Sequence, residues 1–382
     1  MRSSTGQHWI ALDHVRALAA FTVFTWHFTH GIDGYPVPVA GAPALFPLAL
    51  LDEGHSGVAL FMTLSGYLFA KLLDGRSINY PVFFWNRLVR LAPLMIVVVL
   101  IADLATWLAS GEVAVAASFA TVIGGFLLPQ APLERGLWSI VVEAHFYVAL
   151  PVLMVAARRS RWALPLCVIV AVVARLAILE VEGSVKFVAY WTIGGRIDQF
   201  LLGMIAFLHR DRLRGRHGVA IVTALGFAAF YWWFDAAGGW VNYGDGARLW
   251  VVLPTIEGSA YALLIAWYDA SIRPRGDGLS GLIGRAGAYS YSIYLLHFFV
   301  VFAMARFIDR HVMGLSNFYV ACGWSLLCFA AMVPVGRLCF DTIEKPFLRL
   351  RRDYTRPRER RSLAGASGNG VCGTVNPGTS PG

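Results

Sequence analysis

An arginine and a histidine stand at the two ends of an otherwise apolar stretch, RALAAFTVFTWH, at residues 16–27. Eleven residues at about 100° each make roughly three full turns, so Arg16 and His27 share one face of a helix. The rise between them is about 16 Å, half of a bilayer core. Ionisable groups inside membrane spans usually face a bundle interior or an aqueous cavity. We therefore expect Arg16 near the cytoplasmic surface and His27 deeper on the same stripe, although a snorkelling arginine and a core histidine remain an alternative.

A second arginine pair occurs in NRLVRLAP, residues 86–93. Arg87 and Arg90 are three residues apart and so lie on one face of a helix, where a further apolar span begins. Two planar guanidinium groups suit phosphate oxygens, which they bind in a bidentate manner. The pattern favours a phosphate-rich ligand, with ordinary positive flanking charge as the alternative.

Glu143 lies about six residues inside the apolar segment 137–157, at a depth that we expect to match that of His27. A neutral imidazole can take a proton from a hydroxyl group, and a neighbouring carboxylate can orient it and stabilise the imidazolium. We therefore expect His27 to act as a general base with Glu143 as its partner.

Three more ionisable residues fall inside apolar segments. Arg196 and Asp198 are expected to include a structural ion pair, while His297 either hydrogen-bonds in the core or contacts a substrate. Ser65 in SGYLF lacks the flanking pattern of a nucleophilic serine, which disfavours a covalent serine mechanism. The sequence predicts no metal site and no permanently bound cofactor.

The elements that must position these residues are membrane helices. Of 382 residues, 57% are hydrophobic and 14% are charged, whereas soluble domains carry about 25% charged residues. Apolar runs of about 20 residues, enough to cross a bilayer, recur along the chain. The formal charge of +9 is concentrated in short loops such as residues 158–161, which indicates cytoplasmic topology signals rather than nucleic-acid binding. The fold class is all-α, a polytopic integral membrane helical bundle.

The charge distribution predicts about ten transmembrane helices with both termini cytoplasmic. Residues 112–130 are expected to form a re-entrant or surface segment, because a full crossing there would place residues 158–161 outside. The transmembrane domain is predicted over residues 1–350, followed by a tail at 351–382 that is basic and then rich in Gly, Ser and Pro, and disordered. The ten expected spans lie near 12–30, 55–73, 83–108, 137–157, 161–181, 188–208, 218–236, 248–268, 280–305 and 317–341.

Seven stretches, in this order over about residues 10–350, resemble acyltransferase family 3, the membrane O-acyltransferases that acylate sugars and some small molecules. They are LDHVRALAAFTVFTWHF (12–28), SGVALFMTLSGYLF (56–69), FFWNRLVRLAPL (83–94), LWSIVVEAHFYVALP (137–151), GRIDQFLLGMIAF (195–207), GAYSYSIYLLHFFV (287–300) and IEKPF (343–347).

The resemblance implies roles for the residues that match the family's motifs. His27 is the favoured catalytic residue, and Arg16, Arg87 and Arg90 would hold the anionic part of a cytoplasmic acyl-CoA, with acetyl-CoA as the expected co-substrate. Glu143 would orient His27. A second acidic residue is frequent after that glutamate in the family, but here Ala144 follows, which puts in doubt any mechanism that needs two carboxylates. The remaining candidates for substrate binding are Trp138, Ser139, Arg196, Asp198 and His297.

The expected acceptor is a hydroxyl group of a cell-surface glycan, such as an O-antigen or exopolysaccharide, and the expected location is the plasma membrane, which is the inner membrane of a bacterium. Acylation of a small molecule such as an antibiotic is an alternative with the same chemistry. A proton-coupled transporter would use Arg16, His27 and Glu143 differently, but the inverted repeats and broken helix pairs of many transporters are missing. A membrane sensor that keeps the fold without chemistry would not need all these polar residues.

Overall fold

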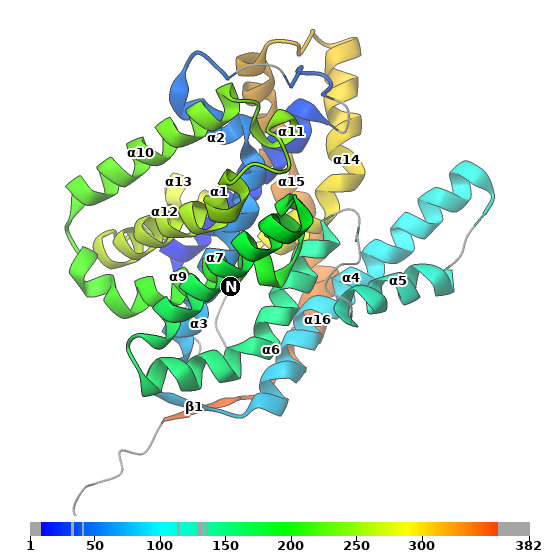
Figure 1. Cartoon of the computed structure of the whole chain (residues 1–382). Helices are drawn as coiled ribbons and strands as arrows, with labels where there is room; N and C mark the ends of the chain where they lie inside the picture. Colours follow the sequence, from blue (N-terminus) through cyan, green and yellow to red (C-terminus); the bar gives the residue numbers. More distant parts are fainter. Residues whose placement is uncertain are drawn as a thin grey trace, which may run out of the picture.

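The computed structural model describes residues 9–31, 34–39, 42–112, 115–127, 133 and 136–357. Helices make up nearly all of this part of the chain (Figure 1). The long helices are α1 (Ile10–His30), α3 (Gly57–Leu73), α4 (Tyr80–Ser110), α6 (Leu137–Arg159), α7 (Ala163–Glu182), α9 (Ile193–Leu213), α10 (His217–Ala236), α12 (Leu249–Ser271), α14 (Ser290–His311) and α15 (Phe318–Cys339). The shorter elements are η1 (Phe46–Leu48), α2 (Ala49–Asp52), η2 (Gly54–Ser56), α5 (Val115–Leu127), α8 (Lys186–Trp191), α11 (Gly239–Asn242), α13 (Gly278–Ala288), η3 (Phe340–Glu344), α16 (Lys345–Leu348), β1 (Arg76–Ile78) and β2 (Thr355–Pro357).

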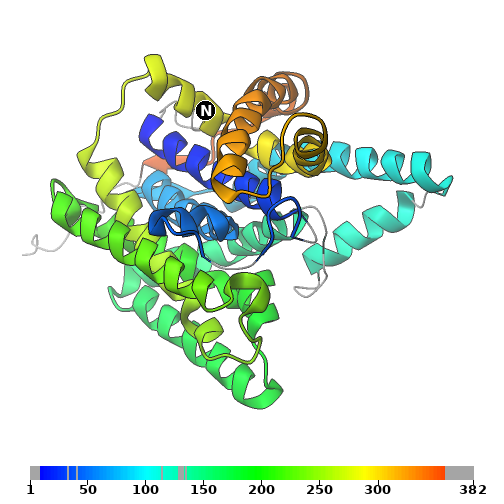
Figure 2. The same cartoon turned by 90° about the horizontal axis from the view of Figure 1, so that it is seen from above.

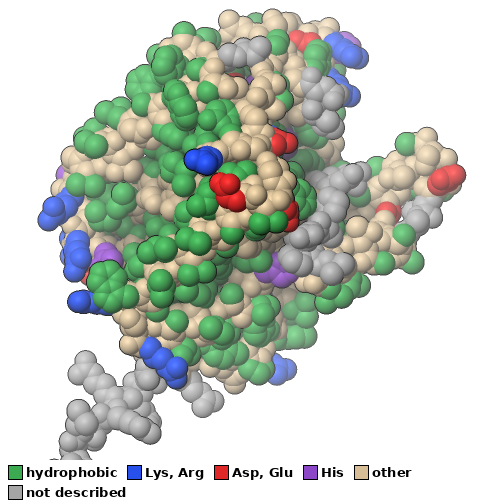
Figure 3. Space-filling view, in the orientation of Figure 1, with side chains coloured by type: hydrophobic (Ala, Val, Ile, Leu, Met, Phe, Trp, Pro, Cys, Tyr) green, Lys and Arg blue, Asp and Glu red, His purple; other side chains and the backbone are tan. Residues whose placement is uncertain are grey.

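Eight of the described helices are long and apolar enough to cross a membrane. Their outer faces are apolar: on α7, for example, Leu166, Ile169 and Val173 are each 58% exposed. Figure 3 shows hydrophobic side chains over much of one face, with Lys and Arg mostly near its margins. These features confirm a polytopic helical membrane protein, while the count of ten spans and the cytoplasmic termini stay predictions.

The helices α1 and α9 have 21 residues each, enough to cross a bilayer, but carry ionisable residues that are buried inside the bundle. Asp13 on α1, and Arg196 and Asp198 on α9, are at most 1% exposed. These two helices pack against α3, which places their polar residues between helices instead of against lipid.

Small residues let the central helices approach closely. A Cβ atom on Gly66 of α3 would lie 1.9 Å from the carbonyl oxygen of Phe200 on α9, and one on Gly203 of α9 would lie 2.0 Å from that of Thr63. Only glycine fits at these two positions, because the backbones of α3 and α9 are in contact there.

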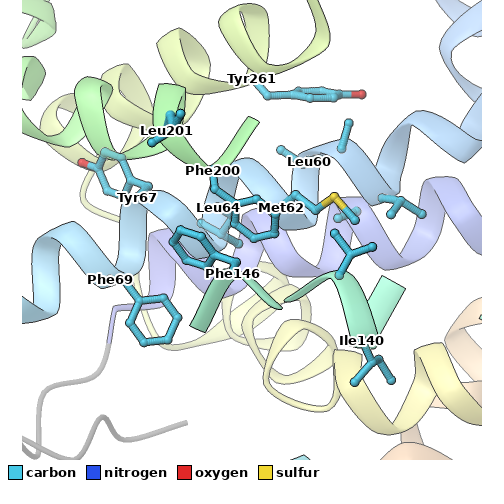
Figure 4. Packing of buried hydrophobic residues seen from close by; sticks show 14 of the residues in the cluster. Leu60, Met62, Leu64, Tyr67, Phe69, Ile140, Phe146, Phe200, Leu201 and Tyr261 are labelled. Atoms are coloured by element: carbon cyan, nitrogen blue, oxygen red, sulfur yellow. The ribbon is translucent and has the colours of Figure 1, made fainter. Parts of the chain in front are cut away.

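Aromatic side chains fill the space beside this crossing. The rings of Phe146 on α6 and Phe200 on α9 stack with their centroids 4.2 Å apart, and Figure 4 shows Phe69 and Tyr67 of α3 on either side of them. The ring of Phe69 also meets that of Tyr147 on α6 at 5.3 Å. The aromatic packing fixes α6 against α3 and α9.

Helix α5 and the C-terminal part of α4 project from the bundle (Figure 2). Asn79 begins α4 by accepting a hydrogen bond from the Val82 backbone, and Gly111, with φ of 74°, ends it. Helix α5 has only 13 residues, fewer than the roughly 20 needed to cross a bilayer. The re-entrant or surface segment expected at 112–130 stays a prediction, with which a helix of this length is compatible.

The chain after α16 returns to the start of α4. We call residues 349–357 the C-terminal strap. Its strand β2 pairs antiparallel with β1, and the Asn86 side chain bonds both the N–H and the carbonyl of Arg352, at 3.0 and 2.7 Å. The predicted tail begins at residue 351, whereas these hydrogen bonds make 351–357 part of the helical domain. The Gly/Ser/Pro-rich stretch from 362 lies outside the described residues.

Candidate active site

Four arginines from three parts of the chain line one pocket, which we call the arginine pocket. Arg16 comes from α1, Arg87 and Arg90 from α4, and Arg351 from the C-terminal strap. The lining holds two carboxylates, and one of them, Asp13, accepts a hydrogen bond from Arg16 at 2.6 Å. The pocket therefore has an excess of positive charge, and it brings together the three arginines that the sequence predicts to act on one ligand.

Packing holds Arg87 over aromatic rings. Its guanidinium carbon lies 5.4 Å from the ring centre of Phe69, 5.5 Å from that of Phe83 and 5.8 Å from that of Tyr147. The Nε atom of Arg87 is buried and has no hydrogen-bond partner among the described residues. Cation–π contacts stabilise the charge and leave the N–H groups free for a ligand.

The strap adds a residue that was not expected in the site. The Nε and Nη2 atoms of Arg351 are buried without a hydrogen-bond partner in the described part of the chain. Burial and, to a smaller extent, the charges of Arg90 and Arg87 together lower the pKa of Arg351 to about 9. Keeping the Arg351 guanidinium charged in this buried position is therefore unfavourable, and a bound anion would offset the desolvation penalty.

Glu143 and Ser65 lie where the arginine pocket meets a second pocket, which we call the inner pocket. The Ser65 hydroxyl donates to Glu143 at 2.7 Å, and Tyr147 lines the arginine pocket together with the same carboxylate. Arg16 and Arg90 line both pockets as well. The two pockets therefore adjoin at Glu143 and share these side chains as a common wall.

This position corrects the expected partnership of Glu143 with His27. The carboxylate accepts a hydrogen bond from Ser65, and His27 lines neither pocket. A similar depth in the membrane does not bring Glu143 to His27, because the rotation of α6 about its axis turns Glu143 toward α3 and the arginines.

The inner pocket runs between apolar walls toward α14. Ser139 lines it and hydrogen-bonds the Tyr294 hydroxyl at 2.8 Å and the Gly136 carbonyl at 2.9 Å. Neighbouring Trp138 does not line either pocket; its ring packs on that of Tyr190 at 5.0 Å. Of the predicted Trp–Ser pair, only Ser139 faces the cavity.

Two histidines, His27 half-buried and His297 buried, lie beyond Tyr294. The rings of His27 and His297 are 5.3 Å apart, and the Nδ1 atom of His297 hydrogen-bonds the Tyr294 carbonyl oxygen. Nδ1 of His27 and Nε2 of His297 are buried and have no partner among the described residues. His297, which the sequence left open between a core and a substrate role, is thus beside the predicted catalytic histidine.

Arg196 and Asp198 do not pair with each other. Asp198 accepts from Arg175 at 2.7 Å, while Arg196 donates to Gln199 and lies 4.0 Å from Glu257. Residues two apart on a helix point to nearly opposite faces, so each finds its partner on a different neighbour. Both side chains are in structural ion pairs behind the inner pocket, and neither lines it.

Sequence reasoning missed Ser65, Tyr294 and Arg351 as site residues. Ser65 lies in an apolar stretch where the sequence favours a small residue that allows close helix packing. Arg351 stands in a basic run that is typical of cytoplasmic loops, and its approach to the pocket depends on the hydrogen bonds of Asn86 and on the β1–β2 pairing.

Comparison with protein families identifies the family of the chain. The model of acyltransferase family 3, described as an acyltransferase domain, matches residues 9–333, which include α1 to most of α15. No curated protein and no solved structure matches the chain. The matched residues contain both histidines, Glu143 and three of the four pocket arginines.

Proposed function

Because the chain belongs to acyltransferase family 3 and is a membrane O-acyltransferase, we propose that it moves an acyl group from cytoplasmic acyl-CoA to a hydroxyl group of a cell-surface glycan. The observation that supports this proposal is the order of the site residues. The arginine pocket adjoins the inner pocket at Glu143, and the inner pocket is lined by Tyr294, whose ring lies 5.8 Å from that of His297.

The donor assignment rests on charge. A coenzyme A thioester carries several phosphate oxygens at one end and a reactive acyl group at the other, joined by a long pantetheine arm. Guanidinium groups bind phosphate in a bidentate manner. Arg16, Arg87 and Arg90 would therefore hold the phosphates, and the arm would extend through the inner pocket. Arg16 and His27 are about 16 Å apart along α1, so the two ends of the donor have separate sites.

The proposed chemistry places His27 at the acyl group. Its imidazole accepts the proton of the acceptor hydroxyl, the oxygen attacks the thioester carbonyl carbon, and the carbon–sulfur bond breaks. The CoA thiolate leaves and takes up the proton from the imidazolium. A route through an acyl-histidine, with attack by the imidazole first, uses the same residues. His297, whose ring faces His27, would position the imidazole.

A glycan acceptor is supported by aromatic side chains near His27 on the far side from the arginines. The rings of Trp26 and His27 are 4.8 Å apart, and Trp26 also meets His55, whose ring lies 5.1 Å from that of Trp240. Aromatic rings with polar groups between them suit sugar faces and hydroxyls. A small hydroxyl-bearing molecule would fit the same description, and a bacterial inner membrane would present either acceptor.

The test is transfer of labelled acetyl from acetyl-CoA to the surface glycans of cells that express the chain. Wild type should label the glycans, His27→Ala should reduce the label by about 1000-fold or to background, and His311→Ala should match wild type because His311 is exposed at the end of α14. Equal labelling with His27→Ala would overturn the role of His27. Absence of label with every protein, despite binding of acetyl-CoA, would overturn the glycan acceptor.

A further inference from the structure

The C-terminal strap lies outside the residues that the family model matches, yet it forms a wall of the arginine pocket. The match ends at residue 333, and the strap contributes Arg351 and Tyr354 to the lining. Three hydrogen bonds dock its backbone on the first turns of α4: Trp85 Nε1 donates to the Leu350 carbonyl at 3.1 Å, and the two bonds of Asn86 hold Arg352. The strap is therefore fixed to the helix that carries Arg87 and Arg90.

Three buried donors in this wall have no acceptor in the described part of the protein. They are the Nε and Nη2 atoms of Arg351 and the Tyr354 hydroxyl, and Arg87 adds its Nε atom from α4. The ring of Tyr354 is held at 5.5 Å from that of Phe83, which fixes the hydroxyl. Buried donors without acceptors are costly unless a ligand satisfies them, and four donors beside one pocket suit an anion with several oxygens.

We infer that the C-terminal strap is part of the donor site, with Arg351 and the Tyr354 hydroxyl binding the 3′-phosphate of the coenzyme A moiety. This inference rests on the proposed acyl-CoA donor and adds a specificity element to it. Arg351 acts here as a binding residue; the acyl transfer itself takes place at the other end of the site.

The distribution of the arginines between the two pockets indicates which phosphate of coenzyme A lies near Arg351. Arg16 and Arg90 line both pockets, whereas Arg351 and Arg87 line the arginine pocket and not the inner pocket. The pantetheine arm must enter the inner pocket to bring the thioester toward His27. The nucleotide end of the donor then lies on the side of Arg351 and Arg87, and the 3′-phosphate is the charged group at that end. The diphosphate falls nearer to Arg16 and Arg90.

The experiment measures binding of coenzyme A and of 3′-dephospho-coenzyme A to the purified full chain in lipid nanodiscs. Wild type should prefer coenzyme A by roughly tenfold or more, the usual effect of a charge-assisted contact. Arg351→Met, which keeps the apolar stem, should lower affinity for coenzyme A to that for the dephospho form and leave the latter unchanged. Tyr354→Phe keeps the ring and should cost coenzyme A binding roughly threefold.

Arg352→Met is the matched control, because the Arg352 side chain is exposed and only its backbone bonds Asn86. It should behave as wild type. Unchanged binding of dephospho-coenzyme A shows that the Arg351→Met pocket is folded. A tenfold preference that survives Arg351→Met, or equal loss of both ligands, overturns the inference while the donor assignment stands. Wild type that binds neither ligand overturns the donor assignment, and the inference with it.

Discussion

At the scale of single residues, the site separates two kinds of chemistry. The arginines gather where phosphate would bind, and the two histidines lie about three helical turns away in apolar surroundings. Glu143 stands between them, hydrogen-bonded to Ser65 and lining the same pocket as Arg16 and Arg90. Its negative charge offsets part of the excess positive charge of the arginine pocket, and it does not contact the imidazole that it was expected to orient.

This geometry predicts the effect of Glu143→Gln. The glutamine keeps an oxygen for the Ser65 hydroxyl but removes a negative charge beside the arginines, so the KM for the anionic donor should fall by roughly two- to tenfold. The kcat should change much less than in His27→Ala, and its pH dependence should match wild type. Steady-state kinetics over a pH range, with Ser65→Ala as the control that keeps the charge, tests this. A shifted pH profile with a kcat loss as large as in His27→Ala would restore the orienting role.

What the sequence could predict of the site follows from helical periodicity. Spacing along one helix places Arg16 with His27, and Arg87 with Arg90, because both pairs depend only on the turn of a helix. The approach of Glu143 to Ser65 depends on how α6 rotates against α3, and that of Arg351 depends on the fold-back of the strap. Neither leaves a periodic pattern in the sequence.

At the scale of elements, the crossing of α3 and α9 positions the site. Ser65 precedes Gly66, whose missing side chain lets the backbone of α9 approach. The sequence predicts both helices from their apolar length, and the bounds agree within a few residues, for example 55–73 against Gly57–Leu73. The closeness of the two backbones was not predictable, because small residues are common in membrane helices for several reasons.

We expect Gly66→Ala to destabilise the protein by about 1–3 kcal/mol, since its Cβ would lie 1.9 Å from the Phe200 carbonyl oxygen and must push α9 away. The shift should also lower acyl transfer, because Ser65 moves with Gly66. Gly226→Ala in α10 is the control, as no atom lies within 4 Å of its added Cβ. Thermal unfolding in detergent compares the two variants; an unfolding temperature of Gly66→Ala equal to that of Gly226→Ala would contradict the close crossing.

At the scale of the whole molecule, hydrogen bonds fix the relative direction of α4 and α6. Arg158 at the end of α6 donates to the carbonyl of Arg76, just before α4, at 2.7 Å. The start of α4 and the end of α6 therefore share one face of the bundle. Between them, α5 stays near the other ends of both helices: Ser118 donates to Asp103 at 2.6 Å, and Phe126 accepts from His145 at 2.9 Å. The chain thus enters and leaves α5 on one side.

This arrangement predicts that Glu112 and Arg161 face opposite sides of the membrane, with Arg161 on the cytoplasmic side because of the positive charges around it. Both residues are exposed. In a variant without its five native cysteines, a membrane-impermeant maleimide should label Glu112→Cys on intact cells and label Arg161→Cys only after permeabilisation. Labelling of both from outside would mean that α5 crosses the bilayer. That result would contradict the hydrogen bond from Arg158 to Arg76 and the docking of the C-terminal strap on Asn86, because both need the start of α4 and the later helix ends to share one face.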